Sequence, residues 1–365
     1  MQNKIINIAL VGCGRISEKH LTNIFKLQNQ INLIAICDND ENKLLKTKKF
    51  ISDLPQANIN HAKEIKNFYD YDYLLNKISL GEIDIDLIVL CTPSGYHAEQ
   101  CIKAGNLGIN VCTEKPLATS LKDGYDIANC FKNNKANLFV VLQNRLNPTV
   151  RLVKKQIDKG RFGKLFLITS NVFWHRPQSY YDQDSWRGTH KLDGGALLNQ
   201  SCHYVDLISY ISNCAVNKVS AFCNTLKRNI EMEDTAVMNF EFENGMLANL
   251  SSTMLTYPKN IEGSMTILGE KGTVKIGGIA LNKIEKWIFE EKTDEDNMLD
   301  EVNYEVDSVY GSGHFYFYQK ILDTLVRKEK NLFSIEEGLI NLELIMAAYK
   351  SSNQKIVSTI KSSFN

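Results

Sequence analysis

The chain has 365 residues, 44% of them hydrophobic and 23% charged, which predicts a globular protein of two domains. Lysine plus arginine and aspartate plus glutamate both total 42, so no excess positive charge is present to hold nucleic acid, and no nucleic-acid partner is expected. No run approaches about 20 apolar residues and the first residues lack a signal-peptide pattern, so we expect a cytoplasmic protein without a membrane partner.

The first predicted element is the apolar run KIINIALVG, whose β-branched content is typical of a buried parallel strand. The turn Gly12-Cys13-Gly14-Arg15-Ile16 follows it, then a helical stretch, and then a second apolar run that ends at Asp38. In a dinucleotide-binding turn, the first glycine permits the tight bend and the second lets the backbone approach the pyrophosphate. A carboxylate at the position of Asp38 accepts hydrogen bonds from ribose hydroxyls and repels a ribose phosphate. The pattern therefore predicts NAD as the cofactor.

Three later strands of the first half end in polar residues: one before Thr92, one before Glu114, and one, ANLFVVLQNR, that is expected to run to Asn144-Arg145. In an open parallel sheet, ligands collect at the carboxyl ends of the strands, so these residues are expected in one cofactor cleft. A simple turn with a helix cap, or a surface ion pair, would explain any one of these ends alone. Together with the glycine turn they predict a cofactor site that includes Arg15, Ile16, Thr92, Pro93, His97, Glu114, Lys115 and Asn144.

From about residue 165 the chain alternates short apolar strands with turns, which predicts a mostly antiparallel sheet. The turns ENGM and GEKGT are hairpin signals. Two amphipathic helices, HFYFYQKILDTLVRK and IEEGLINLELIMAAYKSSNQ, close the sequence and are expected to pack back on the first domain. We predict a first domain over residues 1–146 and a second over residues 147–365.

The stretch LDGGALLNQSCHYVD, residues 192–206, opens on two glycines and continues in a helical pattern. Helical spacing places Asn199, His203, Asp206 and Tyr210 on one face. Three interpretations are open for this polar face. Amide oxygens are poor ligands for metals that prefer imidazole, so no metal site is predicted. His203 could be a buried histidine paired with Asp206, or a catalytic group beside Asn199.

Nine cysteines are scattered along the chain without a Cys-x-x-Cys pair. Their odd number and their places inside apolar strands argue against a disulfide framework and against a zinc knuckle. We therefore predict reduced thiols.

The series GCGRIS, Asp38, CTPSGYH, TEKP, QNR and GGALLNQSCHYVD resembles the Gfo/Idh/MocA oxidoreductases over nearly the whole chain. The resemblance implies an α/β fold with an N-terminal Rossmann domain and a C-terminal α+β domain on a large, mostly antiparallel sheet. It implies that Lys115 lies beside the nicotinamide and the substrate hydroxyl, before a cis bond to Pro116. It also implies a homo-oligomer, either a dimer or a tetramer.

The segment FWHRPQSYYDQDSWRGTHKLDGGALLNQSCH is similar to a branch of bacterial UDP-sugar 3-dehydrogenases that oxidises UDP-N-acetylglucosaminuronic acid for surface polysaccharides. The family often carries Asp where this chain has Asn199, which cannot act as a base. We interpret His203 as the base, Lys115 as the group that polarises the oxygen and Asn199 as the group that orients the hydroxyl. The reverse assignment, with Lys115 as the base and His203 as the polarising group, stays open. Substrate contacts are predicted for Arg145, Arg176, Tyr181, Trp186, Arg187, Thr189, Asn199, His203 and His314.

Two other functions stay open at this point. One is oxidation of UDP-N-acetylglucosamine for a lipid A diamino sugar, which would need no partner for a carboxylate. The other is an NAD-binding regulatory protein without activity, against which the presence of Lys115 and His203 argues. 2-Oxoglutarate is a candidate electron acceptor for the reduced cofactor.

Overall fold

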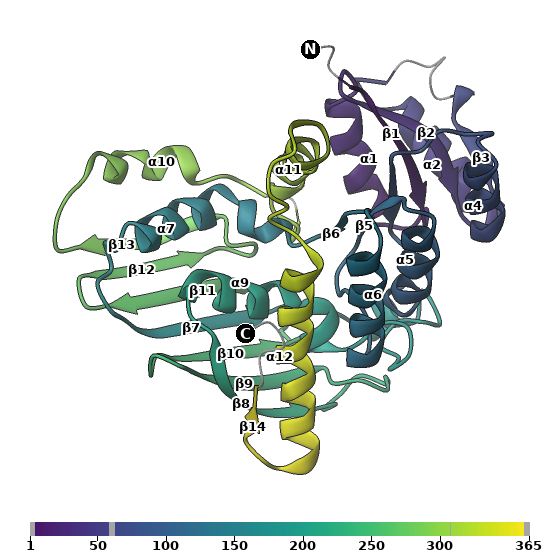
Figure 1. Ribbon diagram of the computed structural model, residues 1–365. Helices are drawn as coiled ribbons and strands as arrows, with labels where there is room; N and C mark the ends of the chain where they lie inside the picture. Colours follow the sequence, from purple (N-terminus) through teal and green to yellow (C-terminus); the bar gives the residue numbers. More distant parts are fainter. Residues whose placement is uncertain (1–3, 58–62, 307, 361–365) are drawn as a thin grey trace. The chain divides into compact units, whose positions relative to one another are not determined.

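A computed structural model of the chain describes residues 4–57, 63–306 and 308–360 (Figure 1). The chain divides into two compact units, and each is described by itself. The first unit comprises Met1–Ala118, Lys122–Val141 and His314–Leu339, and the second comprises Thr119–Leu121, Leu142–Gly313 and Ile340–Asn365.

The first unit is built on a six-stranded sheet in the order β3-β2-β1-β4-β5-β6, in which every described pair is parallel. This is the strand order of a dinucleotide-binding fold, so the predicted Rossmann domain is confirmed. Its central strands are apolar and buried along their length, as parallel strands covered on both faces must be. The strands are β1 (Ile6–Val11), β2 (Ile31–Cys37), β3 (Lys66–Phe68), β4 (Leu87–Leu90), β5 (Asn110–Thr113) and β6 (Leu138–Val140).

The helices of the first unit connect these strands, apart from one that comes from much later in the sequence. Asp40 and Asp70 cap two of them, each carboxylate accepting a backbone N–H of the first turn. The late helix, α11 (Gly313–Arg327), buries Phe317 and Tyr318, and the Phe317 ring lies 4.9 Å from that of Phe333. The others are α1 (Ser17–Lys26), α2 (Glu41–Ser52), α4 (Tyr71–Ser79), η1 (Ser94–Tyr96), α5 (His97–Asn106) and α6 (Leu121–Asn133).

The turn after β1 packs directly against the end of β4, at the point where the strand order reverses. Gly12 has a φ of +92°, and a Cβ placed on it would lie 2.6 Å from the carbonyl carbon of Cys91 and 2.7 Å from the nitrogen of Thr92. Only glycine fits both the conformation and the space. Ligands of open α/β sheets bind at this reversal point, so the packing of Gly12 shapes the floor of that crevice.

The second unit is built on an eight-stranded sheet in the order β13-β12-β11-β7-β10-β9-β8-β14. Among its described strands only β7 and β10 pair in parallel, which confirms the mostly antiparallel sheet. Both predicted hairpins are present, between β9 and β10 and between β11 and β12. The strands are β7 (Leu165–Phe173), β8 (Val216–Asn224), β9 (Thr235–Phe242), β10 (Leu247–Thr253), β11 (Glu262–Gly269), β12 (Gly272–Gly277), β13 (Lys283–Phe289) and β14 (Ser358–Thr359).

Helices cover one face of this second sheet, with α9 against β7 and β10 and α7 against β12 (Figure 1). The apolar side chains of the stretch after the two glycines are buried, with Leu198, Val205 and Ile208 at most 2% exposed. The helical elements are η2 (Gln143–Leu146), α7 (Pro148–Asp158), α8 (Gln178–Tyr181), η3 (Ala196–Gln200), α9 (Cys202–Ser212), η4 (Asp294–Met298), α10 (Leu299–Val302) and α12 (Ile335–Gln354).

Two local predictions were wrong. The strand expected to run to Arg145 ends at Val140, and residues 143–146 form the 3-10 turn η2. The expected continuous helix after Gly195 starts as the π-helical turn η3, in which Ser201 N–H donates to the carbonyl of Ala196, and breaks at Ser201 before α9. Asn199 and His203 therefore lie on different elements. π-Helical turns are rare and concentrate at functional sites.

None of the helices in the described ranges is long and apolar enough to cross a membrane. All nine cysteines are free thiols in the structure. Burial raises the pKa of the Cys101 thiol to about 12, so that this side chain behaves as a small apolar group.

Gly12→Ala should destabilise the first unit, because a methyl group would meet backbone atoms of Cys91 and Thr92 and the φ of +92° would strain any side chain. We expect a loss of about 2–4 kcal/mol in the free energy of unfolding, measured by chemical denaturation. Gly14→Ala is the matched control, since a Cβ there meets no described atom within 4 Å. Equal stability of the two variants would contradict this account of the turn.

Candidate active site

The turn between β1 and α1 is arranged to receive an anion. The carboxylate of Asp38 accepts N–H bonds from Cys13 at 2.8 Å and from Asp40 at 2.9 Å, which fixes it beside the turn. Ile16 precedes α1 and supplies no side-chain cap to the amino end of that helix. The space beside Gly14 is open among the described residues. Open space at a helix amino end next to a fixed carboxylate fits the pyrophosphate and ribose of a dinucleotide.

The ends of β4 and β5 are joined by His97, which is 1% exposed. Its Nδ1 lies 2.8 Å from the carbonyl oxygen of Pro116 and its Nε2 lies 3.0 Å from that of Thr92. Burial lowers the pKa of His97, against the opposing effect of these two carbonyls. His97 thus fixes the loop that carries Thr92 and Pro93, and the Lys115–Pro116 bond that it contacts is cis, as expected.

Glu114 is a buried carboxylate held by His20 of α1 and by the backbone of the next residue. Its Oε1 lies 2.9 Å from Nε2 of His20, and its Oε2 accepts the backbone N–H of Lys115 at 3.1 Å. Burial acts to raise the pKa of Glu114, but the hydrogen bond and charge of His20, with the charges of Lys115 and His314, outweigh it and lower that pKa to about 2. An ionised carboxylate therefore lies next to Lys115, whose residue is partly exposed.

His20 extends this network into α11. Its Nδ1 lies 2.7 Å from the hydroxyl of Tyr318, and its ring packs edge-on against His314 with 5.5 Å between centroids. Burial lowers the pKa of His314 to about 3. His314 was predicted to contact substrate, but at 3% exposure against His20 its position does not support that role.

His20, Glu114 and His314 place possible metal-ligand atoms within 4.8 Å of one another. Two of these atoms already face each other at hydrogen-bond distance, and His20 also contacts Tyr318. The arrangement is explained by a hydrogen-bond network, and the predicted absence of a metal stays a prediction.

His203 lies in the first turn of α9 and is 8% exposed. Its Nε2 lies 3.4 Å from the amide nitrogen Nε2 of Gln143, which also donates to Oδ1 of Asn144 at 3.3 Å. An amide nitrogen can only donate, so this contact favours the tautomer in which Nε2 of His203 carries the lone pair. Asn144, predicted to bind cofactor, is 4% exposed in the structure.

Asp206 is paired with Arg145. The guanidinium donates to both carboxylate oxygens, at 2.8 and 2.5 Å, and lies 4.5 Å from the centroid of the Tyr210 ring. The two side chains are 6% and 2% exposed, so the pair is buried. Arg145 was predicted to grip a substrate anion, and that two-point contact is made to Asp206 instead. The four residues of the predicted polar face therefore do not act together. Asp206 and Tyr210 contact Arg145 and so hold η2 in place beside α9.

The π-helical turn η3 is held in place by Glu233. The carboxylate accepts the N–H of Leu197 at 2.7 Å and the hydroxyl of Tyr349 at 3.0 Å, while the carbonyl of Glu233 accepts the N–H of Ala196 at 2.9 Å. A Cβ on Gly195 would lie 2.4 Å from the Glu233 carboxylate. The second glycine of the pair is therefore required by this close approach.

The segment before the glycine pair gathers arginines around Tyr180. Guanidinium carbons of Arg176 and Arg187 lie 5.5 and 4.6 Å from the centroid of its ring. Arg187 donates to the Tyr180 hydroxyl at 2.9 Å and to Asp184 at 2.9 Å, and Arg176 donates to Gln200 at 3.0 Å. Two guanidinium groups, one of them ion-paired with Asp184, lie on one partly exposed ring, and guanidinium groups are suited to bind a phosphate or a carboxylate.

The other residues predicted in this segment shape it. Tyr181 is 6% exposed and packs edge-on against Tyr180, so it is part of the core of the unit. The Trp186 ring lies 4.6 Å from the Arg187 guanidinium. The Thr189 hydroxyl donates to the carbonyl of Trp186 at 2.7 Å and accepts the N–H of Leu192, which closes a local turn.

Sequence reasoning missed four residues of these networks: His20, Gln143, Asp193 and Glu233. Asp193 directly precedes the glycine pair and could have been found there. Gln143 stands in the QNR motif, but no local pattern shows its partner or those of His20 and Glu233, since long-range packing brings each to its partner.

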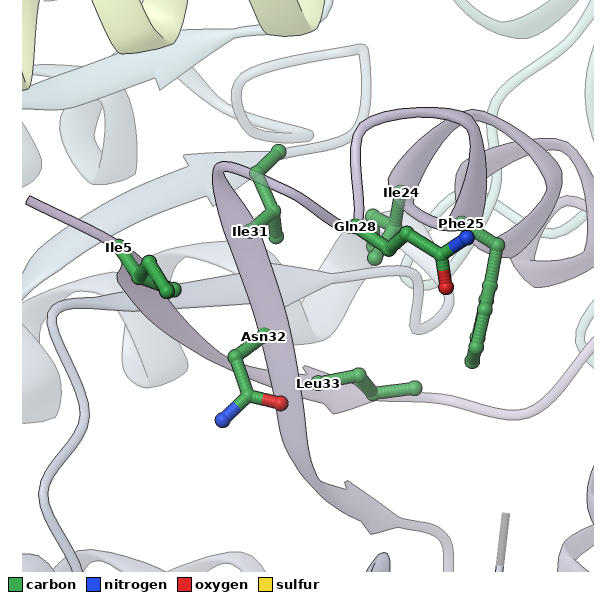
Figure 2. Close-up of a pocket in the computed structure, with 7 residues that line it drawn as sticks. All are labelled: Ile5, Ile24, Phe25, Gln28, Ile31, Asn32 and Leu33. Carbon is green, nitrogen blue, oxygen red and sulfur yellow. The ribbon is translucent and has the colours of Figure 1, made fainter. Parts of the chain in front are cut away.

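One small hollow of about 210 Å³ lies elsewhere, lined by Ile5 just before β1, by residues of α1 and β2, and by Gln28 between them (Figure 2). Its walls are apolar apart from Gln28 and Asn32, and it lies near the amino ends of the strands. It offers no titratable group and is distinct from the glycine turn.

Family comparisons agree with both units. Residues 6–142 match the Gfo/Idh/MocA model described as the NAD-binding Rossmann fold of an oxidoreductase family, and residues 154–360 match the model of its C-terminal alpha/beta domain.

Two solved structures are similar over the whole chain. The WlbA dehydrogenase of Bordetella pertussis, in complex with NADH and UDP-GlcNAcA, is 39% identical with a TM-score of 0.89, covering 99% of both chains. The Chromobacterium violaceum WlbA, with the same two ligands, is 37% identical with a TM-score of 0.89, covering 100% of this chain and 98% of that one. A Comamonas testosteroni 1-carboxy-3-chloro-3,4-dihydroxycyclohexa-1,5-diene dehydrogenase is 26% identical over 271 residues, 73% of this chain and 63% of that protein.

Glu233→Gln should make stability less dependent on pH. Burial raises the pKa of Glu233 to about 7, above its ordinary value of 4.5 and against the hydrogen bonds from Leu197 and Tyr349. The folded state therefore holds a proton that the unfolded state releases, and the associated stability, present at acid pH, is lost as pH rises through 7. Above that pH the variant should be about 1–3 kcal/mol more stable than the parent protein in denaturant titrations. Glu231→Gln, at an exposed carboxylate that accepts the N–H of His190, is the control. Parallel pH profiles for the Glu233 variant and the parent would contradict the assignment.

Proposed function

The chain belongs to the Gfo/Idh/MocA oxidoreductase family, and on that premise we propose that it oxidises the 3-hydroxyl of UDP-N-acetylglucosaminuronic acid with NAD. The observation that carries this proposal is the whole-chain likeness to the two WlbA structures that hold NADH and UDP-GlcNAcA. The first unit binds the cofactor and the second binds the sugar nucleotide. The product is a 3-keto sugar for surface polysaccharide biosynthesis.

The cofactor is held by residues of the glycine turn and of the strand ends. The Asp38 carboxylate accepts hydrogen bonds from the ribose hydroxyls. The backbone N–H groups near Gly14, Arg15 and Ile16 bind the pyrophosphate, and Thr92 and Pro93 line the crevice. When bound, NAD supplies the acceptor for the hydrogen that leaves carbon 3 with its electron pair. Lys115 is fixed by the ionised Glu114 beside it, whose carboxylate accepts the Lys115 backbone N–H.

Proton removal is assigned to His203. Oxidation of a hydroxyl requires its proton to leave as the carbonyl forms, and an acceptor within hydrogen-bond reach is needed. In the tautomer that Gln143 favours, Nε2 of His203 carries the lone pair, and this nitrogen takes the proton when the substrate hydroxyl replaces the Gln143 amide beside it. The Lys115 ammonium polarises the same oxygen, and Asn199 orients the hydroxyl.

The anionic groups of the substrate are assigned to the two arginines around Tyr180. A UDP-uronic acid carries a diphosphate and a carboxylate, and the guanidinium groups of Arg176 and Arg187 can each bind such an anion in two-point fashion. Trp186 and Thr189 hold this segment. Arg145 acts indirectly, since its contact with Asp206 positions α9 and hence His203.

The wider setting completes the proposal. The protein acts in the cytoplasm as a homo-oligomer, either a dimer or a tetramer, and 2-oxoglutarate reoxidises the NADH.

The substrate assignment is tested with NAD-loaded protein given UDP-N-acetylglucosaminuronic acid or UDP-N-acetylglucosamine, each with and without 2-oxoglutarate. We expect turnover of the uronic acid, sustained by 2-oxoglutarate, and little with the uncharged sugar, because only the former offers a carboxylate. The readouts are binding heat and NADH absorbance. A preference for UDP-N-acetylglucosamine would place the protein with lipid A enzymes. Turnover of neither sugar nucleotide would contradict the proposal.

Lys115→Ala and His203→Ala should each lower kcat by about 10²–10⁴-fold, since each removes a group that acts on the departing proton or its oxygen. NADH affinity, followed by fluorescence titration, should stay within a few-fold of the parent protein. Normal turnover in either variant would remove that residue from the mechanism. Lys191→Ala, at an exposed lysine, is the control.

A further inference from the structure

Asp193 is a buried carboxylate to which the proposed function gives no role. It is 1% exposed and directly precedes the glycine pair that leads into η3. Its Oδ2 accepts the N–H of Gly188 at 2.6 Å, and its Oδ1 accepts the side-chain amide Nδ2 of Asn199. One carboxylate thus joins the arginine-bearing segment to the π-helical turn.

We infer that Asp193 is a positioning residue that orients the Asn199 amide, so that Asn199 presents its carbonyl oxygen to a hydrogen-bond donor of the substrate. The inference rests on the proposed function. Both oxygens of Asp193 accept hydrogen bonds, one from Gly188 and one from Asn199, so the Asn199 amide turns its nitrogen toward Asp193. Because the amide is planar, Oδ1 then points away from Asp193. Asn199 is partly exposed, so a ligand can reach this side chain.

The backbone around the glycine pair holds Asp193 and Asn199 together. Gly194 has a φ of +103°, and its N–H donates to the carbonyl of Thr189 at 3.0 Å. Gly188, the other partner of Asp193, has a φ of +69°, and a Cβ there would lie 2.7 Å from Ile230. Both ends of the link are therefore fixed by backbone that only glycine fits.

The chemistry of the substrate suits an acceptor at this place. In a 2-acetamido sugar, the reacting carbon 3 lies between an acetamido N–H and the 4-hydroxyl, and both are donors. A fixed acceptor therefore selects sugars that keep a donor beside carbon 3. Where a family member carries Asp in place of Asn199, a carboxylate presents an acceptor without help. In this chain Asn199 needs Asp193 to do so.

The test is a swap of the two side chains, measured beside each single variant. In Asp193→Asn, the introduced amide can still accept the N–H of Gly188 through its oxygen but now turns its own N–H₂ toward Asn199. Asn199 should flip, and KM for the UDP-sugar should rise by about tenfold or more, with kcat lower as well because Asn199 also orients the reacting hydroxyl. Asn199→Asp places two carboxylates face to face and should lower Tm at neutral pH.

The double variant Asp193→Asn/Asn199→Asp keeps both hydrogen bonds and again presents an acceptor. Its KM and its Tm should therefore return most of the way to the values of the parent protein. Asp182→Asn, at an exposed carboxylate that accepts from Gln178, is the control and should leave both unchanged. An unchanged KM in Asp193→Asn, or no recovery in the double variant, would overturn the inference.

The Tm measurements test this inference independently of the proposed function. If the parent protein turned over no UDP-sugar, the proposed function would fail, yet the Tm values of the four proteins would still report the Asp193–Asn199 contact. Recovery of Tm in the double variant would support that contact, and its absence would refute the orienting role. Acetamido and hydroxyl donors are distinguished by KM for UDP-glucuronic acid and for a 4-deoxy analogue.

Discussion

The close approach of Gly195 to Glu233 is the constraint on which the substrate side of this protein depends. Backbone and carboxylate of Glu233 together take the N–H groups of Ala196 and Leu197, and no side chain at position 195 would allow this. The turn that results is π-helical, so Asn199 and His203 leave it from separate elements and meet different partners. Asn199 meets Asp193, and His203 meets Gln143.

The cofactor side depends on a similar contact. Gly12 packs on the end of β4, at the reversal of strand order, and His97 ties that end to the loop after β5. Buried polar groups then fix the charge beside Lys115, since Glu114 stays ionised through His20. In each unit a closely packed glycine fixes the shape of a turn: Gly12 packs on backbone atoms and Gly195 on a carboxylate. Buried hydrogen bonds then fix the side chains near that turn.

The fold and the cofactor side could largely be predicted from the sequence. Apolar runs ending in Gly12, Asp38 and Thr92 carry a local signal for strands and turns, and their order identifies the sheet. The break at Ser201 could not be predicted, because helical periodicity is the same for an α-helix and for one interrupted by a π-helical turn. β13 was not predicted either, since its exposed edge position leaves no clear alternation of apolar residues.

The partners within the site were harder to foresee. Arg145 carries the right group for a substrate anion, but its bidentate contact goes to Asp206, and nothing in either local sequence shows that pairing. Glu233 reaches η3 from the segment just before β9, far along the chain. By contrast Asp193 lies within the stretch that also holds Asn199 and His203, and only its hydrogen bonds to Gly188 and Asn199 show what it does.

The most direct test of the central claim, that this chain oxidises carbon 3 of a UDP-N-acetylated uronic acid, is a single turnover with substrate deuterated at carbon 3. The protein is mixed with NAD, and the nicotinamide product is analysed by mass spectrometry. The account predicts one deuterium in the NADH and a slower absorbance rise than with unlabelled substrate. Formation of unlabelled NADH at an unchanged rate would show that another carbon is oxidised and would contradict it.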